Sequence, residues 1–289
     1  MAEYAERLPT AALSTDRADT DQIRASLNNY GAVSLALSDA ETTALGTLTQ
    51  ESTSFFDLPD TSKGNYAPTS LSDWNGYMAP RSAGLDDKGD DFERISLSPE
   101  SPATAQVAAL ARDLPHLQNS VDTVFHALIE RCRQLNTMLS TMIGVDAAEA
   151  DRIWFDEHSS RLAINHYPRT APMAIAPHRD FGGISLVYVG KDSSGLQLFG
   201  STEDQWCSIT TGQEPTIIAL LGELYSYWTN EMWPAALHRV ADPRPGRVSV
   251  ILFHTPNRQN ELSAIGSADS SVLVESFLSQ VEQRYIRIK

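Results

Sequence analysis

The sequence predicts a mainly β fold with flanking helices, in which short antiparallel strands form a sandwich or barrel. From about residue 153 to 260, short segments rich in Ile, Val, Leu and aromatic residues alternate with turn residues. Many short strands at such spacing are typical of antiparallel sandwiches and barrels. Before this region, apolar residues recur every three to four positions over residues 116–144, which predicts one long amphipathic helix.

The bulk composition is that of a globular protein and excludes several functional classes. Of the 289 residues, 42% are hydrophobic, which is enough for a sizeable core. No stretch of about 18 apolar residues is present, so we expect no membrane-spanning helix. The N-terminal stretch lacks the basic start and apolar block of a secretion signal. A formal net charge of −15 repels phosphate groups, so we expect neither nucleic acid nor a membrane as a partner.

The two cysteines, Cys132 and Cys207, are too few for a disulfide framework. We expect both to be buried or half-buried thiols in a reducing compartment, which favours a cytoplasmic protein. Nothing in the sequence looks like a dedicated dimerisation helix, so a monomer is the simplest expectation.

Residues 1 to about 100 are expected to mix helices and short strands. Residues 19–31 read as a helix that ends at Gly31, and residues 32–37 as a strand that follows it. A second helix is predicted over residues 39–59, where Pro59 ends it. Residues 60–91 are rich in Gly, Pro, Ser and Asp and predict a long loop region.

The strand-rich region contains seven segments of alternating or continuous apolar character, and a closing amphipathic helix is predicted over residues 271–286. The predicted strands lie within residues 161–168, 183–190, 195–199, 206–210, 215–222, 237–241 and 247–256.

His178 and Asp180 are two positions apart, beside a segment that reads as a strand. On a strand, alternate residues project to the same face, so both side chains can point inward. His238 begins another strand-like segment 60 residues later. Two histidines and one carboxylate suit non-haem Fe(II), whereas zinc accepts the same donors but cannot change redox state. Taken alone, a His-X-Asp pair is a weak signal, and a polar turn leading into a sheet is the alternative.

A second group of polar residues supports the metal hypothesis. Arg247 and Ser249 share one face of a predicted strand, where a guanidinium and a hydroxyl can bind a carboxylate together. An arginine paired with a structural acid is the alternative. Asn165 and Tyr167 share one face of another predicted strand. They are expected to contact the molecule, a diacid, whose carboxylate Arg247 and Ser249 would bind.

With these residues in this order, the sequence resembles the isopenicillin N synthase-like Fe(II)/2-oxoglutarate-dependent dioxygenases. The resemblance extends over most of the chain, and many ordered landmarks carry it together. The landmarks are "NNYGAVSL", "FFDLP", "NGY", "NHYP", "HRD" with "FGGISLV", "GLQL", Trp206, "LLGEL", "TN" at 229, "LHRV" and "RVSVILFHTPN".

The resemblance implies a double-stranded β-helix, or jelly roll, with His178, Asp180 and His238 as iron ligands. It also implies that Arg247 and Ser249 bind the far carboxylate of 2-oxoglutarate, with Asn165 and Tyr167 beside them. We expect residues 1–100 to form an N-terminal mixed α/β region of this fold. Residues 101–289 would then supply helical support and the catalytic core, the two parts making one structural unit.

The implied activity is oxidation of a small molecule by O2 with release of succinate and CO2, as hydroxylation, desaturation, epoxidation or cyclisation. Natural-product biosynthesis is the expected setting. Two alternatives stay open: an oxidase of the same fold that uses no 2-oxoglutarate, as isopenicillin N synthase does, and a non-catalytic binding protein with a structural metal. The residues considered as substrate contacts are Arg161, Tyr77, Arg81, Tyr225, Trp228 and Trp233.

The sequence departs from the family pattern near the expected active-site mouth. Glu223, Glu231 and Ala235 stand where the family usually has Asp, Gly and Ser. None of these is an expected metal ligand, but they leave the substrate undefined.

Overall fold

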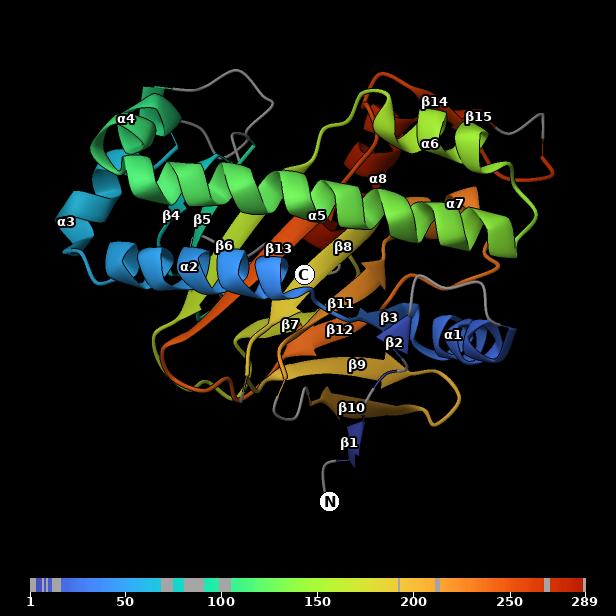
Figure 1. The fold of residues 1–289 in the computed structure, drawn as a ribbon, viewed down its shortest axis with the longest axis horizontal. Helices are drawn as coiled ribbons and strands as arrows, with labels where there is room; N and C mark the ends of the chain where they lie inside the picture. The colour runs from blue at the N-terminus through green and yellow to red at the C-terminus, as the bar shows by residue number, and fades with distance from the viewer. Residues whose placement is uncertain are drawn as a thin grey trace.

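Two facing β-sheets form the centre of the protein, and helices cover the larger sheet (Figure 1). The structure is a computed structural model, and it describes residues 4–6, 8, 10–11, 17–68, 75–80, 91–98, 105–191, 193–210, 214–267 and 271–287. The larger sheet has the order β2-β3-β11-β8-β13-β6-β5-β4, and the smaller has the order β1-β10-β9-β12-β7. Chain neighbours β8 and β9 lie in different sheets, as do β11 and β12. This is the predicted jelly-roll arrangement.

The strands of the larger sheet run antiparallel except where β2 meets β3. They are β2 Thr10–Ala11, β3 Ala32–Leu35, β4 Gly76–Met78, β5 Glu93–Leu97, β6 Arg161–Tyr167, β8 Ile184–Val189, β11 Thr216–Leu221 and β13 Arg247–His254. The smaller sheet contains β1 Tyr4–Glu6, β7 Ile175–His178, β9 Leu196–Gly200, β10 Gln205–Ile209 and β12 His238–Val240. A separate hairpin pairs β14 Glu261–Ser263 with β15 Ser271–Leu273.

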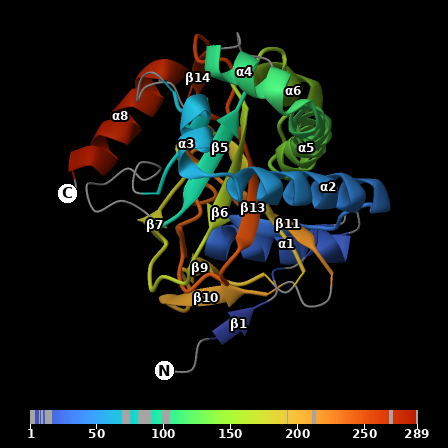
Figure 2. The same ribbon diagram turned by 90° about the vertical axis from the view of Figure 1, so that its left-hand side faces the viewer.

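The helices lie mainly on the outer face of the larger sheet and at the ends of the barrel (Figure 2). They are α1 Arg17–Tyr30, α2 Asp39–Phe56, α3 Asp60–Lys63, the 3-10 turn η1 Gly64–Tyr66, α4 Ala105–Asp113, α5 Pro115–Met142, α6 Ala147–Phe155, α7 Glu223–Trp228 and α8 Val274–Arg287. None of the helices in these described ranges is long and apolar enough to span a bilayer.

The central strand β13 shows how alternation creates two different cores. Its residues Val248, Val250 and Leu252 belong to the apolar cluster shared with α2 and α5. The intervening Ile251 and Phe253 join the cluster between the two sheets. Because successive side chains of a strand project to opposite faces, one strand supports the helical layer and lines the barrel interior.

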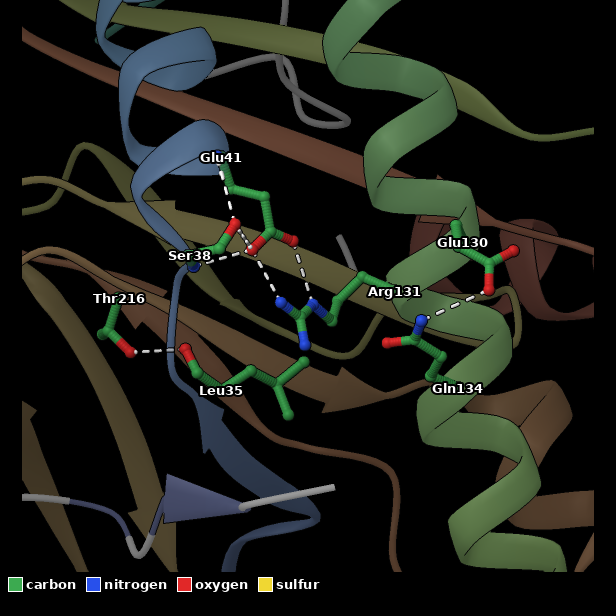
Figure 3. A network of polar contacts seen from close by, with 7 residues as sticks. All are labelled: Leu35, Ser38, Glu41, Glu130, Arg131, Gln134 and Thr216. Atoms are coloured by element: carbon green, nitrogen blue, oxygen red, sulfur yellow. Dashed lines mark hydrogen bonds and ion pairs between the residues drawn. The ribbon is translucent and has the colours of Figure 1, made fainter. Parts of the chain in front are cut away.

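The two long helices α2 and α5 are tied together by a polar contact at the start of α2 (Figure 3). Ser38 caps α2, and its hydroxyl and the Glu41 carboxylate form a reciprocal capping box. The same carboxylate accepts two hydrogen bonds from Arg131 of α5, at 2.9 and 2.6 Å. Capping and helix packing therefore depend on one glutamate.

A buried ionic network lies at the other end of α2, against the edge of the larger sheet. Lys63 donates to Glu93 at 2.7 Å and to the Phe56 carbonyl at 3.1 Å. The Tyr77 hydroxyl and the His166 ring also bond to the Glu93 carboxylate, at 2.7 and 2.8 Å. Four buried or partly buried polar groups are thus satisfied together.

Several sequence predictions are wrong in detail. Residues 60–91 are not one loop, because α3, η1 and β4 fall inside them. The strand β5 and the helices α4 and α6 are additional elements. The predicted helices over residues 19–31, 39–59 and 116–144 correspond to α1, α2 and α5, and all seven predicted strand segments contain a strand.

Candidate metal centre

Three potential ligands converge where β7 and β12 pair and the chain leaves β7. His178, Asp180 and His238 each offer one donor atom, and these atoms lie within 4.8 Å of one another. The Asp180 Oδ1 atom is 3.8 Å from His178 Nε2 and 4.0 Å from His238 Nε2. This is the only such group of three in the part of the chain that the structure describes. The two-histidine, one-carboxylate set can hold Fe(II) and leave coordination positions open.

The two histidines are placed by strand pairing. His178 ends β7, His238 begins β12, and the two are direct partners in the antiparallel register. Each Nδ1 lies close to a backbone carbonyl two residues earlier, at 2.9 Å for Ala176 and 3.1 Å for Ala236. With the proton on Nδ1 donated to that carbonyl, Nε2 keeps its lone pair and faces the third ligand.

Asp180 is held differently from the sequence prediction, because β7 ends at His178 and Asp180 lies in the following turn. The first turn of α7 holds this segment by a backbone hydrogen bond, in which the Glu223 N–H donates to the Asp180 carbonyl at 2.8 Å. Gly222 makes the approach possible, since a Cβ there would come within 2.2 Å of the Gly182 carbonyl oxygen. The carboxylate itself accepts a hydrogen bond from Ser185.

The electrostatics of the three groups favour a deprotonated donor set. Burial and the nearby His238 lower the pKa of His178 to about 4, although Asp180 opposes this change. Burial raises the pKa of Asp180, but the two imidazoles and Ser185 outweigh it and leave the pKa below its ordinary value. At neutral pH, His178 is neutral and Asp180 is charged, the forms that bind a metal ion.

Arg247 lies on the same inner face and is buried, with 7% of its surface exposed. Its Nε and Nη1 atoms are buried and have no hydrogen-bond partner among the described residues, and its guanidinium lies 5.0 Å from the Tyr167 ring centre. The alternative of a structural acid partner receives no support. A buried cation with unused donors fits a ligand carboxylate.

The neighbours of Arg247 match part of the expected group. Tyr167 and Asn165 on β6 are the register partners of Arg247 and Ser249, and all four are buried. The Asn165 Oδ1 atom accepts a hydrogen bond from Arg94 at 2.7 Å. The structure therefore brings together Arg247, Ser249, Asn165 and Tyr167, and adds Arg94. Arg94 could not be placed from the sequence because β5 was not predicted.

Four of the proposed substrate contacts are corrected by the structure. Tyr225, Trp228 and Trp233 are at most 2% exposed and pack in the core shared with the helices. The Tyr225 hydroxyl donates to Asn136 of α5 at 3.0 Å. Tyr77 is 4% exposed and belongs to the Glu93 network. These side chains pack in the core shared with the helices and not in the cluster between the two sheets.

The two arginines among the substrate candidates have different outcomes. Arg161 lies on the inner face, where it is the register partner of Phe253. Arg81 lies outside the described residues.

The fold and the cluster together define a jelly-roll protein with a two-histidine, one-carboxylate centre. Residues 158–256 match the 2OG-Fe(II) oxygenase superfamily, a span that includes the three clustered residues and Arg247. This match covers less than half of the chain, and over that span the chain is similar to a superfamily whose description names 2OG and Fe(II).

Individual relatives are distant in sequence. Validamycin A dioxygenase from Streptomyces hygroscopicus subsp. limoneus is 27% identical over 72% of this chain and 64% of its own length. Jasmonate-induced oxygenase 3 from Arabidopsis thaliana is 22% identical over 60% of this chain and 50% of its own length. The chain thus spans about half to two-thirds of the curated relatives it matches. A solved structure of JOX2 in complex with 2OG, Fe and JA covers 99% of this chain and 90% of its own, with a TM-score of 0.81 at 16% identity. That likeness concerns the fold.

Proposed function

We propose that the protein is an Fe(II)/2-oxoglutarate-dependent dioxygenase that oxidises a small molecule. His178, Asp180 and His238 hold the iron, and Arg247 binds the distal carboxylate of 2-oxoglutarate. The observation that carries this proposal is the buried Arg247 guanidinium, whose Nε and Nη1 have no partner among the described residues. A dicarboxylate that binds the metal through one end would give the buried Arg247 guanidinium a carboxylate partner at the other end.

The chain's residues then have separate tasks. Iron, when bound, supplies the redox chemistry that activates O2 toward a C–H bond. The Nδ1 bonds of the two histidines fix their rings so that Nε2 faces the metal position. Arg247 charge-pairs with the cosubstrate, Ser249 and Tyr167 lie beside it, and the apolar cluster between the sheets excludes water from the reacting atoms.

Two of the curated relatives indicate the class of the substrate. Validamycin A dioxygenase and a relative named proline hydroxylase buaE, from Petromyces alliaceus, support a small molecule of natural-product biosynthesis. Hydroxylation, desaturation, epoxidation and ring closure all fit the same centre. We further propose that the protein acts as a monomer in the cytoplasm.

The second candidate is an oxidase of the same fold that uses no 2-oxoglutarate. A 1-aminocyclopropane-1-carboxylate oxidase from Diospyros kaki, 26% identical over half of this chain, is among the relatives. In that case Arg247 would bind a carboxylate of the substrate itself, since a guanidinium does not discriminate between carboxylates.

The two candidates can be separated by adding Fe(II) and 2-oxoglutarate without oxygen. The proposed function predicts a weak visible charge-transfer band that saturates with 2-oxoglutarate. Arg247→Gln should raise the apparent Kd for 2-oxoglutarate at least about tenfold, because a charge-assisted pair contributes roughly 1.5–3 kcal/mol. Arg244→Gln is the matched control, since Arg244 lies three residues away on the surface and should bind as the wild type does.

The contrary result is equally specific. If no band forms although Fe(II) binds, and O2 is consumed with substrate panels without release of succinate, the oxidase replaces the dioxygenase. Fe(II) binding without a band and without any O2 consumption would favour the non-catalytic binding protein.

A further inference from the structure

Two arginines and a phenylalanine from three strands meet on the inner face of the larger sheet. Phe253 of β13 and Arg161 of β6 are register partners, and the Arg161 guanidinium lies 5.2 Å from the Phe253 ring centre. Arg94 comes from β5, and its guanidinium lies 5.8 Å from the same ring. Its Nε bond to Asn165 fixes the direction in which this side chain crosses β6. We call these three residues the Arg94–Arg161–Phe253 cluster.

The cluster is partly open, unlike its neighbours on the same face. Asn165, Ser249 and Ile251 are 2, 2 and 6% exposed. Arg94, Arg161 and Phe253 are only half-buried. The inner face is therefore closed around the proposed 2-oxoglutarate position and accessible at the cluster.

The cluster is near the candidate metal ligands, and its Arg161 and Phe253 are far from Arg247 along the sheet, whereas Arg94 reaches the neighbours of Arg247 through its bond to Asn165. Both arginines act electrostatically on Asp180, and Arg94 also acts on His178. Along β13, Phe253 is six residues from Arg247, which corresponds to about 20 Å in an extended strand. An anion beside Phe253 and Arg161 and a cosubstrate carboxylate on Arg247 would thus occupy different places.

Two positive charges against one ring in a partly dehydrated position repel each other. Burial lowers the pKa of Arg161 to about 10; the Arg94 and Arg258 charges contribute to this change, and the Asp180 and Glu282 charges oppose it. Both guanidinium groups still carry their charge at neutral pH. A bound anion relieves the repulsion, and a planar carboxylate matches the guanidinium geometry. The half-buried Phe253 ring offers an apolar surface to the rest of such a molecule.

We propose that the Arg94–Arg161–Phe253 cluster binds a carboxylate of the substrate, which makes the substrate an organic acid with an apolar body. The word substrate rests on the proposed oxygenase function, but the anion site does not. Its test therefore uses protein without added metal or 2-oxoglutarate.

The probes are 4-phenylbutyrate and its uncharged analogue 4-phenylbutyramide, which share one shape and differ in charge. Binding is measured by ligand-observed NMR titration in about 0.05 M and 0.5 M NaCl. The wild type should bind the carboxylate at least about tenfold more tightly than the amide, and high salt should reduce this difference. Equal binding of acid and amide overturns the proposal without any variant being made.

Variants then locate the site. Arg161→Gln and Arg94→Gln should each weaken 4-phenylbutyrate binding about tenfold or more, while Arg161→Lys should keep part of the affinity. Arg152→Gln, on the surface of α6, is the charge-matched control. A thermal melt identifies any variant that fails to fold. In that case Arg161→Lys and the comparison of acid and amide binding to the wild type decide whether the cluster binds the carboxylate.

Arg247→Gln separates this proposal from the proposed function. It should abolish the band with Fe(II) and 2-oxoglutarate and leave 4-phenylbutyrate binding unchanged. If Arg247→Gln removes probe binding and the Arg94 and Arg161 variants do not, the probe occupies the cosubstrate position and the anion site is refuted. If the band is absent in the wild type but the arginine variants lose the probe, the oxygenase proposal fails and the anion site stands.

Discussion

His178 and His238 lie directly opposite each other on β7 and β12, with ring centroids 4.1 Å apart. Each ring has a backbone carbonyl as the partner of one of its nitrogens. The Ala176 and Ala236 carbonyls satisfy the Nδ1 atoms, so both Nε2 atoms remain directed toward Asp180. The sheet therefore preorganises the donor set before any ion is present, which is what a tight metal site requires.

The first prediction concerns the ligand role of His238. Replacing it with Ala removes one of three donors, so the affinity for Fe(II) measured anaerobically by titration should fall by more than about 100-fold. His116→Ala, on the exposed start of α5, should bind Fe(II) as the wild type does. Unchanged affinity in His238→Ala would remove the proposed metal centre.

The second prediction concerns the backbone that holds Asp180. In Gly222→Ala, the new Cβ would meet the Gly182 carbonyl oxygen at 2.2 Å and the Asp180 carbonyl oxygen at 3.0 Å. We expect the free energy of unfolding to fall by roughly 1–3 kcal/mol, and Fe(II) affinity to fall with it, because the Asp180 turn must shift.

Gly46→Ala is the matched control for this substitution. Gly46 lies within α2 with nothing inside 4 Å of its Cβ position. Since Ala has the higher helix propensity, this change should raise the free energy of unfolding by about 0.5–1 kcal/mol. Urea unfolding and Fe(II) titration of both variants make the comparison. A Gly222→Ala protein with wild-type metal affinity would show that α7 does not position Asp180.

Strand periodicity explains why much of the fold could be predicted from the sequence. Within β6 and β13, apolar and polar residues alternate, so Asn165, Tyr167, Arg247 and Ser249 could be assigned to one face. The same alternation places His166 and His254 on the opposite face, where His166 contacts Glu93 and His254 contacts Phe155.

The errors have a common physical origin. Tyr225, Trp228 and Trp233 lie in a segment full of turn residues, and aromatic residues there suit either a binding mouth or a core. Only the position of α5, which brings Asn136 to the Tyr225 hydroxyl, decides between them. Arg94 was missed for the same reason, because its meaning depends on β5 pairing with β6, a contact between residues about 70 positions apart.

The third prediction concerns the buried pair of Lys63 and Glu93, whose side chains are 6 and 5% exposed. Burial raises the pKa of Glu93, but bonds from His166, Lys63 and Tyr77 outweigh it, so the pKa lies below its ordinary value. Glu93→Gln removes the buried charge partner of the Lys63 ammonium and leaves it only the exposed Asp60 carboxylate, at 3.1 Å. The free energy of unfolding should fall by roughly 3 kcal/mol, measured by urea denaturation at neutral pH.

The control for this pair is Glu275→Gln, which breaks the exposed pair of Arg258 and Glu275. That change should cost less than about 1 kcal/mol, since exposed ion pairs contribute little. Equal effects of the two substitutions would show that the Lys63 network is not energetically distinct from a surface pair.

The last prediction concerns acid stability and His254. Its ring stacks on Phe155 at 4.3 Å and bonds through Nδ1 to Ser160. Burial, with smaller effects from His158 and Arg133, lowers its pKa from 6.5 to about 3. Between these values the unfolded chain binds a proton that the folded protein does not bind. The free energy of unfolding should therefore fall as the pH falls, with a contribution approaching about 1.4 kcal/mol per pH unit.

In the window from pH 6.5 to 5, Glu41 and Glu93, with pKa values lowered from 4.5, stay ionised, whereas His178, with its pKa lowered to about 4, also contributes to the wild-type slope. The difference between the wild type and a His254 variant therefore isolates the effect of His254. In His254→Asn, which can still bond to Ser160, the slope of the unfolding free energy against pH should decrease by up to about 1.4 kcal/mol per pH unit, the contribution of one proton. In His116→Asn, an exposed counterpart, it should match the wild type. If His254→Asn keeps the wild-type slope, the folded protein binds the proton at His254, and the buried ring is not held neutral.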